Sequence, residues 1–190
     1  MYSDPMTTQD RLIESTQELL WDRGYVGTSP KAIQQQAGVG QGSMYHHFDG
    51  KPDLAAAALR RSAEQLRTLA EQQLGGPGTP LQRIAAYLGR EREVLRGCRI
   101  GRMAQDPEVI ADPRLRAPVE ETLAWLRGRI AEVVAEGQAA GELPAGPDPA
   151  DTAAALVAVV QGGYVLARAA GSPEPFHRAV RGALALLRTP

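Results

Sequence analysis

Hydrophobic and polar positions follow a helical period almost throughout this chain. Within residues 8–23, apolar side chains recur three and four positions apart, and Gly24 then follows, which is typical of an amphipathic helix and its end. Two further apolar pairs, each four positions apart, predict two short helices downstream. The residues that carry these patterns are Leu12, Ile13, Leu19 and Leu20, then Ile33 with Ala37, and last Met44 with Phe48.

Longer segments of the same kind make up the rest of the chain. Gly- and Pro-rich runs at 75–80 and 141–149 separate them and are expected to be loops. No alternating pattern long enough for a strand occurs in the sequence, so the predicted fold is all-α with about nine helices. The expected longer helices are 51–74, 81–95 with an end near Gly97, one after Pro113, 151–170 and 175–188.

Residues 28–48, TSPKAIQQQAGVGQGSMYHHF, carry the signals of two short helices around a tight turn. Ser29 suits an N-cap, and Pro30 suits the first helical position, where a missing N–H costs nothing. Gly38 suits the left-handed residue that ends a helix. Together with the longer helix before them, these signals predict a three-helix unit of the helix-turn-helix type. We place this unit in residues 1–50 and a helical C-terminal domain in 51–190.

The second short helix has two different faces. Met44 and Phe48 are expected to be buried, and the opposite face carries short or planar hydrogen-bonding groups beside a small Gly. A helix with such a face can approach the major groove of DNA closely. The outward residues are Gln41, Gly42, Ser43, Tyr45, His46 and His47.

Composition limits the alternatives. The chain has 190 residues and a formal net charge of −1, which excludes a globally basic coat for nucleic acid. Its single Cys excludes an intramolecular disulfide and metal sites built from paired Cys, and suits a reducing compartment. The N-terminal residues lack the pattern of a secretory signal, and the apolar run 153–160 is far shorter than the ~20 residues that span a bilayer. We therefore expect a cytoplasmic protein without a membrane partner.

The run AGVGQGSMYHHF over residues 37–48, followed by Lys51 and Leu54, resembles the N-terminal signature of TetR-type transcriptional regulators. The preceding GYVGTS over residues 24–29 is similar to the same signature, and the resemblance covers residues 8–56. Further on, GCRIG over 97–101 is similar to a short motif of the LmrA/YxaF-like branch of that family.

The resemblance implies a homodimer whose two helix-turn-helix units occupy adjacent major grooves of a pseudo-palindromic operator. It also implies a small-molecule effector pocket in the C-terminal domain, and no cofactor. By matching positions, it implies that Gln41, Ser43 and Tyr45 read base edges or the groove beside Gly42. The phosphate contacts that it implies are Thr28, Ser29, Tyr45, His46 and Lys51.

Charge in the predicted DNA-binding unit departs from what phosphate binding favours. Residues 1–50 carry three cationic against six anionic side chains. Nonspecific affinity for DNA comes largely from phosphate neutralisation, so this unit is expected to form few ion pairs with DNA. Recognition would then depend on neutral donors, helix N-termini and the avidity of a dimer.

Two other chemistries compete with DNA binding as interpretations of this sequence. His46 and His47 could suggest a metal, but neighbours on a helix point about 100° apart and do not easily share one ion, so no metal is expected. Cys98 has Arg96 and Arg99 nearby, which could lower its thiol pKa, but no His lies close in sequence to act as a base. A packed or pocket-lining thiol is therefore the favoured interpretation, and no catalytic residue is expected.

The remaining candidates lie in the C-terminal domain. Large side chains are scarce there, and those on different helices could converge on an effector pocket, although large residues at helical spacing also form ordinary cores. The last two helices carry apolar and small residues that suit either a dimer interface or packing within one chain. The pocket candidates are Tyr87, Leu88, Cys98, Met103, Trp125 and Tyr164, and the interface candidates are Leu156, Val160, Phe176, Val180 and Leu184.

The sequence thus predicts a ligand-responsive DNA-binding regulator, namely a repressor that a small, largely apolar effector releases from its operator. One alternative is a helical protein that binds a small molecule or partner and keeps a vestigial DNA-binding unit, which the acidic N-terminal charge would favour. A second alternative is a thiol enzyme that uses Cys98, although the sequence offers it neither a base nor an oxyanion site.

Overall fold

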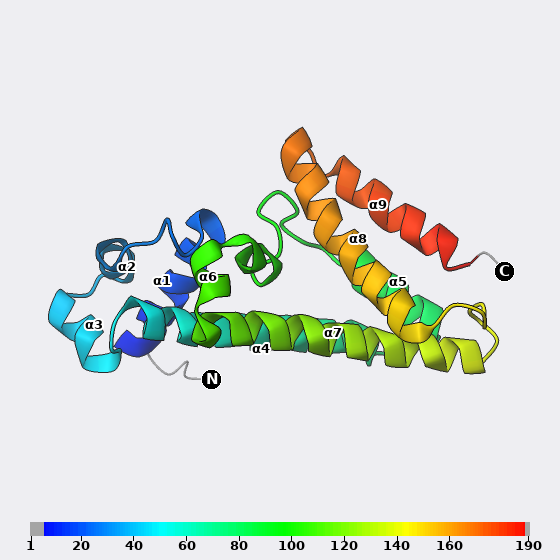
Figure 1. The fold of residues 1–190 in the computed structure, drawn as a ribbon, viewed down its shortest axis with the longest axis horizontal. Coiled ribbons are helices and arrows are strands. Elements are labelled where there is room, and N and C mark those ends of the chain that lie inside the picture. The colour runs from blue at the N-terminus through cyan, green and yellow to red at the C-terminus, as the bar shows by residue number, and fades with distance from the viewer. Residues whose placement is uncertain (1–5, 189–190) are drawn as a thin grey trace. The chain divides into compact units, whose positions relative to one another are not determined.

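The computed structural model describes residues 6–188, and the regular elements in that range are all helical, as the sequence predicts (Figure 1). Nine α-helices and one short 3-10 turn lie in these residues. In chain order they are α1 (Thr8–Arg23), α2 (Pro30–Ala37), α3 (Gln41–His47), α4 (Lys51–Leu74), α5 (Pro80–Gly89), the turn η1 (Gly101–Gln105), α6 (Pro107–Ala111), α7 (Pro113–Ala139), α8 (Pro149–Ala170) and α9 (Glu174–Leu186).

Contacts divide the described chain into two compact units. The first contains the residues up to 65 together with 99–121, and the second contains 66–98 and the residues from 122 onward. Helices α4 and α7 each begin in the first unit and continue into the second. The segment 99–121 thus belongs to the same compact unit as the N-terminal helices, whereas the predicted domain 1–50 leaves this segment out. The boundary after residue 50 stays a prediction about where the DNA-binding function ends.

Local sequence signals account for the helix ends in the first unit. The Ser29 hydroxyl accepts the Ala32 N–H at 3.2 Å, and Pro30 occupies the first turn of α2. Gly38 ends α2 at φ 63° and ψ 38°, a left-handed conformation in which glycine has no Cβ to clash. These are the cap and stop residues expected from the sequence.

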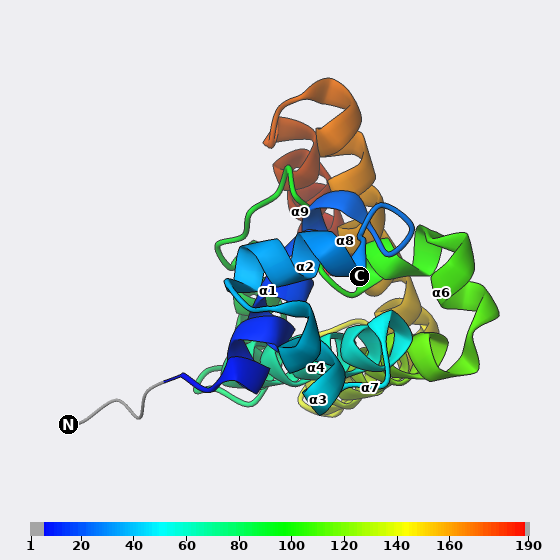
Figure 2. The same ribbon diagram turned by 90° about the vertical axis from the view of Figure 1, so that its left-hand side faces the viewer.

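Three helices of the first unit close around a small apolar core. Leu12 on α1, Ile33 on α2 and Met44 on α3 are each fully buried, and Phe48 at the end of α3 is 6% exposed. Helix α1 contacts both α2 and α3, and Figure 2 shows the two short helices following one another beside it. The helix-turn-helix arrangement predicted from residues 28–48 is therefore present.

Helix α5 ends earlier than its hydrophobic pattern predicts. It stops at Gly89 instead of continuing to residue 95, and residues 90–98 form an irregular segment. The Arg92 guanidinium folds back onto the helix end, where Nη1 donates to the Leu88 carbonyl at 2.5 Å and Nη2 donates to the Tyr87 carbonyl. These carbonyls have no partner within a helix that ends here, so the arginine replaces the missing next turn.

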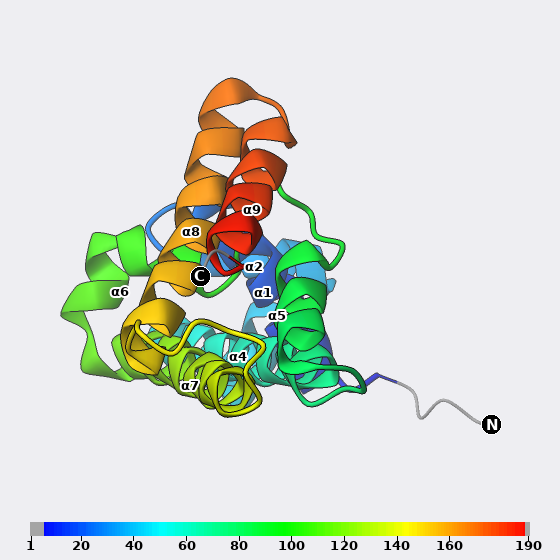
Figure 3. The same cartoon turned by 90° about the vertical axis from the view of Figure 1, so that its right-hand side faces the viewer.

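Helices α8 and α9 lie side by side in the second unit (Figure 3). The Tyr164 and Phe176 rings stack across them with centroids 4.8 Å apart. Gly163 permits this approach, because a Cβ built there would lie 2.9 Å from the Phe176 ring. Among the described residues, α8 is the one helix long and apolar enough to cross a membrane by length and composition. Several of its apolar side chains, such as Leu156 and Val160, are instead buried in the core of this unit.

Candidate DNA-binding surface and effector cavity

Helix α3 exposes polar side chains on one face and buries an apolar side chain on the opposite face. Met44 is fully buried, and its sulfur accepts a hydrogen bond from Gln34 Nε2 at 3.4 Å, which ties α3 to α2. Tyr45 is 52% exposed, an unusual degree for an aromatic side chain in a small domain. A Cβ built on Gly42 would meet nothing within 4 Å, so a groove wall could come close at that position. Gln41, Gly42, Tyr45, His46 and His47 are exposed, and Ser43 is half-buried.

Of the two hydroxyls before α2, one faces solvent and one does not. Ser29 is exposed, and because its oxygen only accepts the capping N–H, its own proton can be donated to a phosphate. Thr28 is 2% exposed, its hydroxyl donates to the Gly24 carbonyl at 2.7 Å, and its N–H donates to the Tyr25 carbonyl at 3.1 Å. The expected phosphate contact from Thr28 is therefore corrected to a structural role in this turn.

Lys51, another expected phosphate contact, lies against an aromatic ring. Its Nζ is 3.8 Å from the centroid of Tyr25, which is a cation–π distance. Burial lowers the pKa of Lys51, and the nearby Glu108 and Asp106 carboxylates oppose that effect. Lys51 is half-buried at the first turn of α4, so its contact with DNA stays a prediction.

Sequence reasoning missed the residues that hold the turn before α2. Asp106 Oδ2 accepts the N–H groups of Tyr25 at 2.8 Å and Val26 at 3.1 Å, while Oδ1 caps α6. Arg102 donates to the Trp21 and Asp22 carbonyls at the end of α1. The pair Asp106-Pro107 is a recognisable helix start, but nothing in the local sequence indicates a contact about 80 residues back along the chain.

The structure separates the six pocket candidates. Tyr87, Leu88 and Tyr164 are buried in the core of the second unit, and Cys98 and Trp125 are partly buried against it. Met103 is fully buried in the turn η1, which belongs to the first unit. Because the chain after Cys98 returns to the first unit, Met103 does not share a core with the other five.

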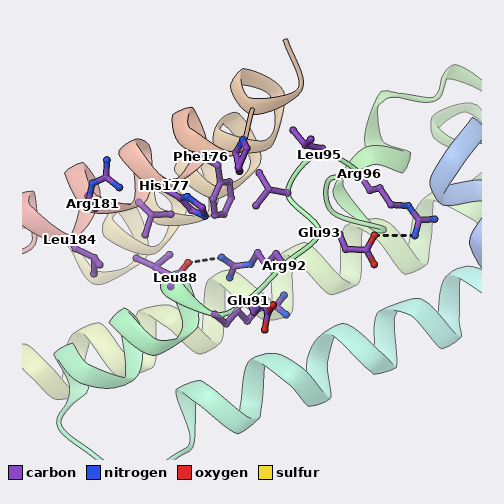
Figure 4. A pocket seen from close by; sticks show the side chains of 15 residues that line it. Leu88, Glu91, Arg92, Glu93, Leu95, Arg96, Phe176, His177, Arg181 and Leu184 are labelled. Carbon is purple, nitrogen blue, oxygen red and sulfur yellow. Dashed lines mark hydrogen bonds and ion pairs between the residues drawn. The ribbon is translucent and has the colours of Figure 1, made fainter. Parts of the chain in front are cut away.

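Cavities of ligand size occur among the described residues of the second unit. One, of about 720 Å³, is lined by Leu88, the segment 89–96 and one side of α9, and it includes a single pocket candidate, Leu88 (Figure 4). Another, of about 630 Å³, is mostly apolar and lies between the end of α7, the loop 143–147, α8 and α9. A third, of about 520 Å³, contains Trp125, whose ring centroid is 5.8 Å from Arg67 Cζ.

Ionisable groups beside the first of these cavities are shifted by burial. Burial raises the pKa of both Tyr87 and Tyr164, so the two phenols stay protonated well above neutral pH. Burial lowers the pKa of Arg92, whose guanidinium nonetheless stays charged at any physiological pH. None of the described residues forms a cluster of His, Cys, Asp and Glu that could hold a metal ion.

The expected interface residues require a correction. Leu156, Val160, Phe176 and Val180 are between 2% and 6% exposed, because they pack inside the second unit of a single chain. Leu184 is half-buried against the same core. The four buried side chains are therefore used within the subunit, whereas Leu184 stays a predicted interface residue. The apolar or small residues that stay exposed on the other side of α8 include Ala154, Ala158, Gly162, Val165, Leu166 and Ala169.

A three-helix unit with an exposed polar helix, followed by a helical domain with ligand-sized cavities, defines a helix-turn-helix transcriptional regulator that responds to a ligand. Residues 12–58 match the family described as bacterial regulatory proteins, tetR family, and residues 80–183 match the tetracyclin repressor-like, C-terminal domain. The chain therefore belongs to the TetR family of transcriptional regulators. Members of this family bind DNA operators and small-molecule effectors and act as dimers.

Individual relatives agree with this membership. The chain is 29% identical to the transcriptional regulator AcuR of Cereibacter sphaeroides over 94% of this chain and 84% of the relative. A crystal structure of the regulatory protein TetR from Rhodobacter sphaeroides is 30% identical, with a TM-score of 0.83 over 94% of this chain and 97% of that one. The regulator LmrA of Bacillus subtilis is 25% identical over 62% of this chain and 66% of the relative. Assignment to the LmrA branch stays a prediction.

Proposed function

We propose that this chain is a cytoplasmic homodimeric repressor that binds a partly palindromic operator through α3 and leaves it when a small effector binds. The observation that carries the proposal is the exposed polar face of α3, held in place by a fully buried Met44. Effector binding would favour a conformer whose two α3 helices no longer fit the spacing of the half-sites, which couples two sites through two states. The proposal assigns no catalytic chemistry to the chain.

Gel shifts with the DNA that flanks this protein's own gene test operator binding. Tyr45→Ala should weaken binding by about tenfold or more, because one groove contact of each subunit is lost. Its stability should change by no more than about 0.5 kcal/mol, because Tyr45 is half exposed. Leu69→Ala is the matched control, since Leu69 is 47% exposed on α4 in a different part of the chain. Unchanged DNA affinity in Tyr45→Ala would remove α3 from the reading surface.

The dimer is proposed on the outer faces of α8 and α9. Val165 and Leu166 are 53% and 56% exposed on α8, and Leu186 is 77% exposed on α9. Small neighbours such as Ala158 and Gly162 would let a second helix approach closely. The proposed interface therefore uses the same two helices as the sequence prediction, but exposed residues on them in place of the buried ones.

Sedimentation distinguishes this interface from a monomer. Val165→Asp places a carboxylate in the proposed contact and should shift the chain toward monomer at micromolar concentration, with weaker operator binding because the avidity of two half-sites is lost. Leu69→Asp is the matched control, since Leu69 is 47% exposed on α4 and belongs neither to the proposed interface nor to the DNA-binding helices. A dimer that survives Val165→Asp unchanged would place the interface elsewhere.

A further inference from the structure

Arg92 is a partly buried cation that forms no ion pair with a described carboxylate. Its terminal nitrogens donate to the carbonyls of Leu88 and Tyr87, and its Nε is fully buried with no hydrogen-bond partner. No ion pair to Arg92 occurs among residues 6–188. A guanidinium enclosed in protein is normally paired with a carboxylate, because the cost of desolvating the charge is otherwise uncompensated.

The surroundings of Arg92 are aromatic. Its Cζ lies 5.4 Å from the ring centroids of both Tyr87 and Phe176, so the guanidinium sits between two π faces. The lowered pKa of Arg92 has burial as its largest cause, and the neighbouring Arg90 lowers it further. Stacking and two carbonyls stabilise the cation in part, and they leave the charge itself without a counter-ion.

Arg92 lines the cavity of about 720 Å³ between the segment 89–96 and α9, where it points toward the end of α5 (Figure 4). The other charges of this cavity can be assigned to pairs. Arg96 contacts Glu93 at 3.3 Å, and Arg181 contacts Glu174 at 2.9 Å. Arg90, Arg92 and Glu91 are the remaining charged residues of the lining, which leaves one positive charge in excess when His177 is counted as neutral.

A simpler interpretation treats Arg92 as a cap on α5. A cation at a helix C-terminus is favourable, and the two carbonyl contacts fit that role. A buried Nε without a hydrogen-bond partner occurs on Arg11, Arg67, Arg83 and Arg90 as well as on Arg92, so that atom does not distinguish a cap from a ligand site. A cap leaves the charge of Arg92 without a counter-ion, and it gives no reason for the adjacent cavity, whose opposite wall includes the apolar Phe176, Val180 and Leu184.

We propose that this cavity binds a small molecule with one carboxylate group, which pairs with Arg92 while an apolar body lies along α9. The guanidinium fork matches a carboxylate, and a single excess charge suits a monoanion better than a phosphate dianion. The ligand is the effector of the proposed repressor, so that part of the inference rests on the proposed function. The binding site itself does not depend on DNA binding.

Calorimetry on the full chain tests the site without DNA. Butyrate, octanoate and dodecanoate are each compared with the primary amide of the same length at constant ionic strength. At least one carboxylate should bind about tenfold or more tightly than its amide, because the charge-assisted pair to Arg92 is lost in the amide. Equal affinities for every acid and its amide would overturn the proposal.

Substitutions test whether Arg92 causes the preference for the carboxylate over its amide. Arg92→Gln should remove the preference for the acid, and Arg181→Gln should keep it, because Arg181 lines the same cavity but pairs with Glu174. Circular dichroism checks folding, and if Arg92→Gln does not fold, Arg92→Lys keeps the charge without the fork and should reduce the preference. A preference that survives in the folded variant would overturn the assignment.

DNA release is measured separately. If a carboxylate binds to the chain but does not release operator DNA, the binding site is supported and its role as the effector site is refuted. A chain that binds no flanking DNA at all would refute the proposed function and leave the site standing.

Discussion

Asp106 holds the turn between α1 and α2 in place with one carboxylate. Oδ2 accepts the N–H groups of Tyr25 and Val26, and Oδ1 accepts those of Glu108 at 3.1 Å and Val109 at 3.4 Å. Gly24 makes room for it, because a Cβ there would lie 3.0 Å from Oδ2 and would also be strained at φ 73°. We therefore expect Asp106→Ala to loosen the segment that leads into α2.

The magnitude follows from the two roles of this side chain. Loss of an N-cap costs about 1 kcal/mol. Each hydrogen bond from an N–H to a charged acceptor is worth roughly 1.5 kcal/mol at the lower end of its range, and the half-buried Asp106 makes two of these to the turn. Unfolding free energy should therefore fall by about 3–4 kcal/mol, allowing for partial rescue by water.

Urea unfolding followed by circular dichroism measures the difference. Asp112→Ala is the matched control, since Asp112 caps α7 through the Arg114 N–H at 2.9 Å and bonds no distant backbone. It should cost about 1 kcal/mol. Hydrogen exchange at the Tyr25 and Val26 amides should accelerate in Asp106→Ala and not in the control. Equal losses in the two variants would refute the idea that Asp106 anchors the turn.

Three further outcomes are expected. A plot of the logarithm of operator affinity against the logarithm of salt concentration should have a slope no steeper than about −4 per dimer. This slope corresponds to about two neutralised phosphates per subunit, and a slope near −8 would contradict the small number of ion pairs. Gly163→Ala should lower the unfolding free energy by about 1–3 kcal/mol, because the new methyl meets Phe176, whereas Gly128→Ala, which meets nothing within 4 Å on the exposed side of α7, should be neutral or stabilising in thermal unfolding. The Arg129 guanidinium lowers the pKa of Glu71, so this pair stabilises the fold above the ordinary Glu pKa of 4.5 and the effect is lost as pH falls through the lower folded pKa. The stability curves of wild type and Arg129→Met should therefore differ near pH 7 and converge in acid, and a constant difference at all pH values would point to packing instead.

The helix-turn-helix was predictable because its signals are local. The cap at Ser29, the proline after it and the glycine that ends α2 each act within a few residues, and all three function as the sequence predicts. Thr28 shows the limit of this reasoning. Of two adjacent hydroxyls, the backbone path from Gly24 to Thr28 decides which one is buried, and that path is held by Asp106 from far along the chain.

Hydrophobic periodicity gave wrong predictions where it could not tell which part of the structure an apolar position packs against. Val94 and Leu95 lie at helical spacing after Leu88, yet α5 ends at Gly89 and the segment that follows lines a cavity. On α8 both faces are rich in apolar or small residues, and packing in the core of the second unit, which includes Tyr164 against Phe176, decides which face is used within the subunit. A sequence reports that a face is apolar, and the tertiary structure decides what covers it.

The acidic charge of the N-terminal unit has a structural explanation. Asp10 pairs with Arg61 at 2.7 Å, and Glu18 pairs with Arg99 at 2.6 Å, so two of its carboxylates are engaged within the first unit. The exposed face of α3 carries no carboxylate, although Asp49 follows the helix directly and is exposed. Local charge near the reading helix, and not the total, determines how strongly phosphates are repelled, because the Debye length is about 8 Å at physiological salt. An overall negative charge in this unit is therefore compatible with operator binding. Because α3 itself carries neutral hydrogen-bond donors and no Lys or Arg, we expect neutral donors, and not ion pairs, to contribute most of its affinity for DNA.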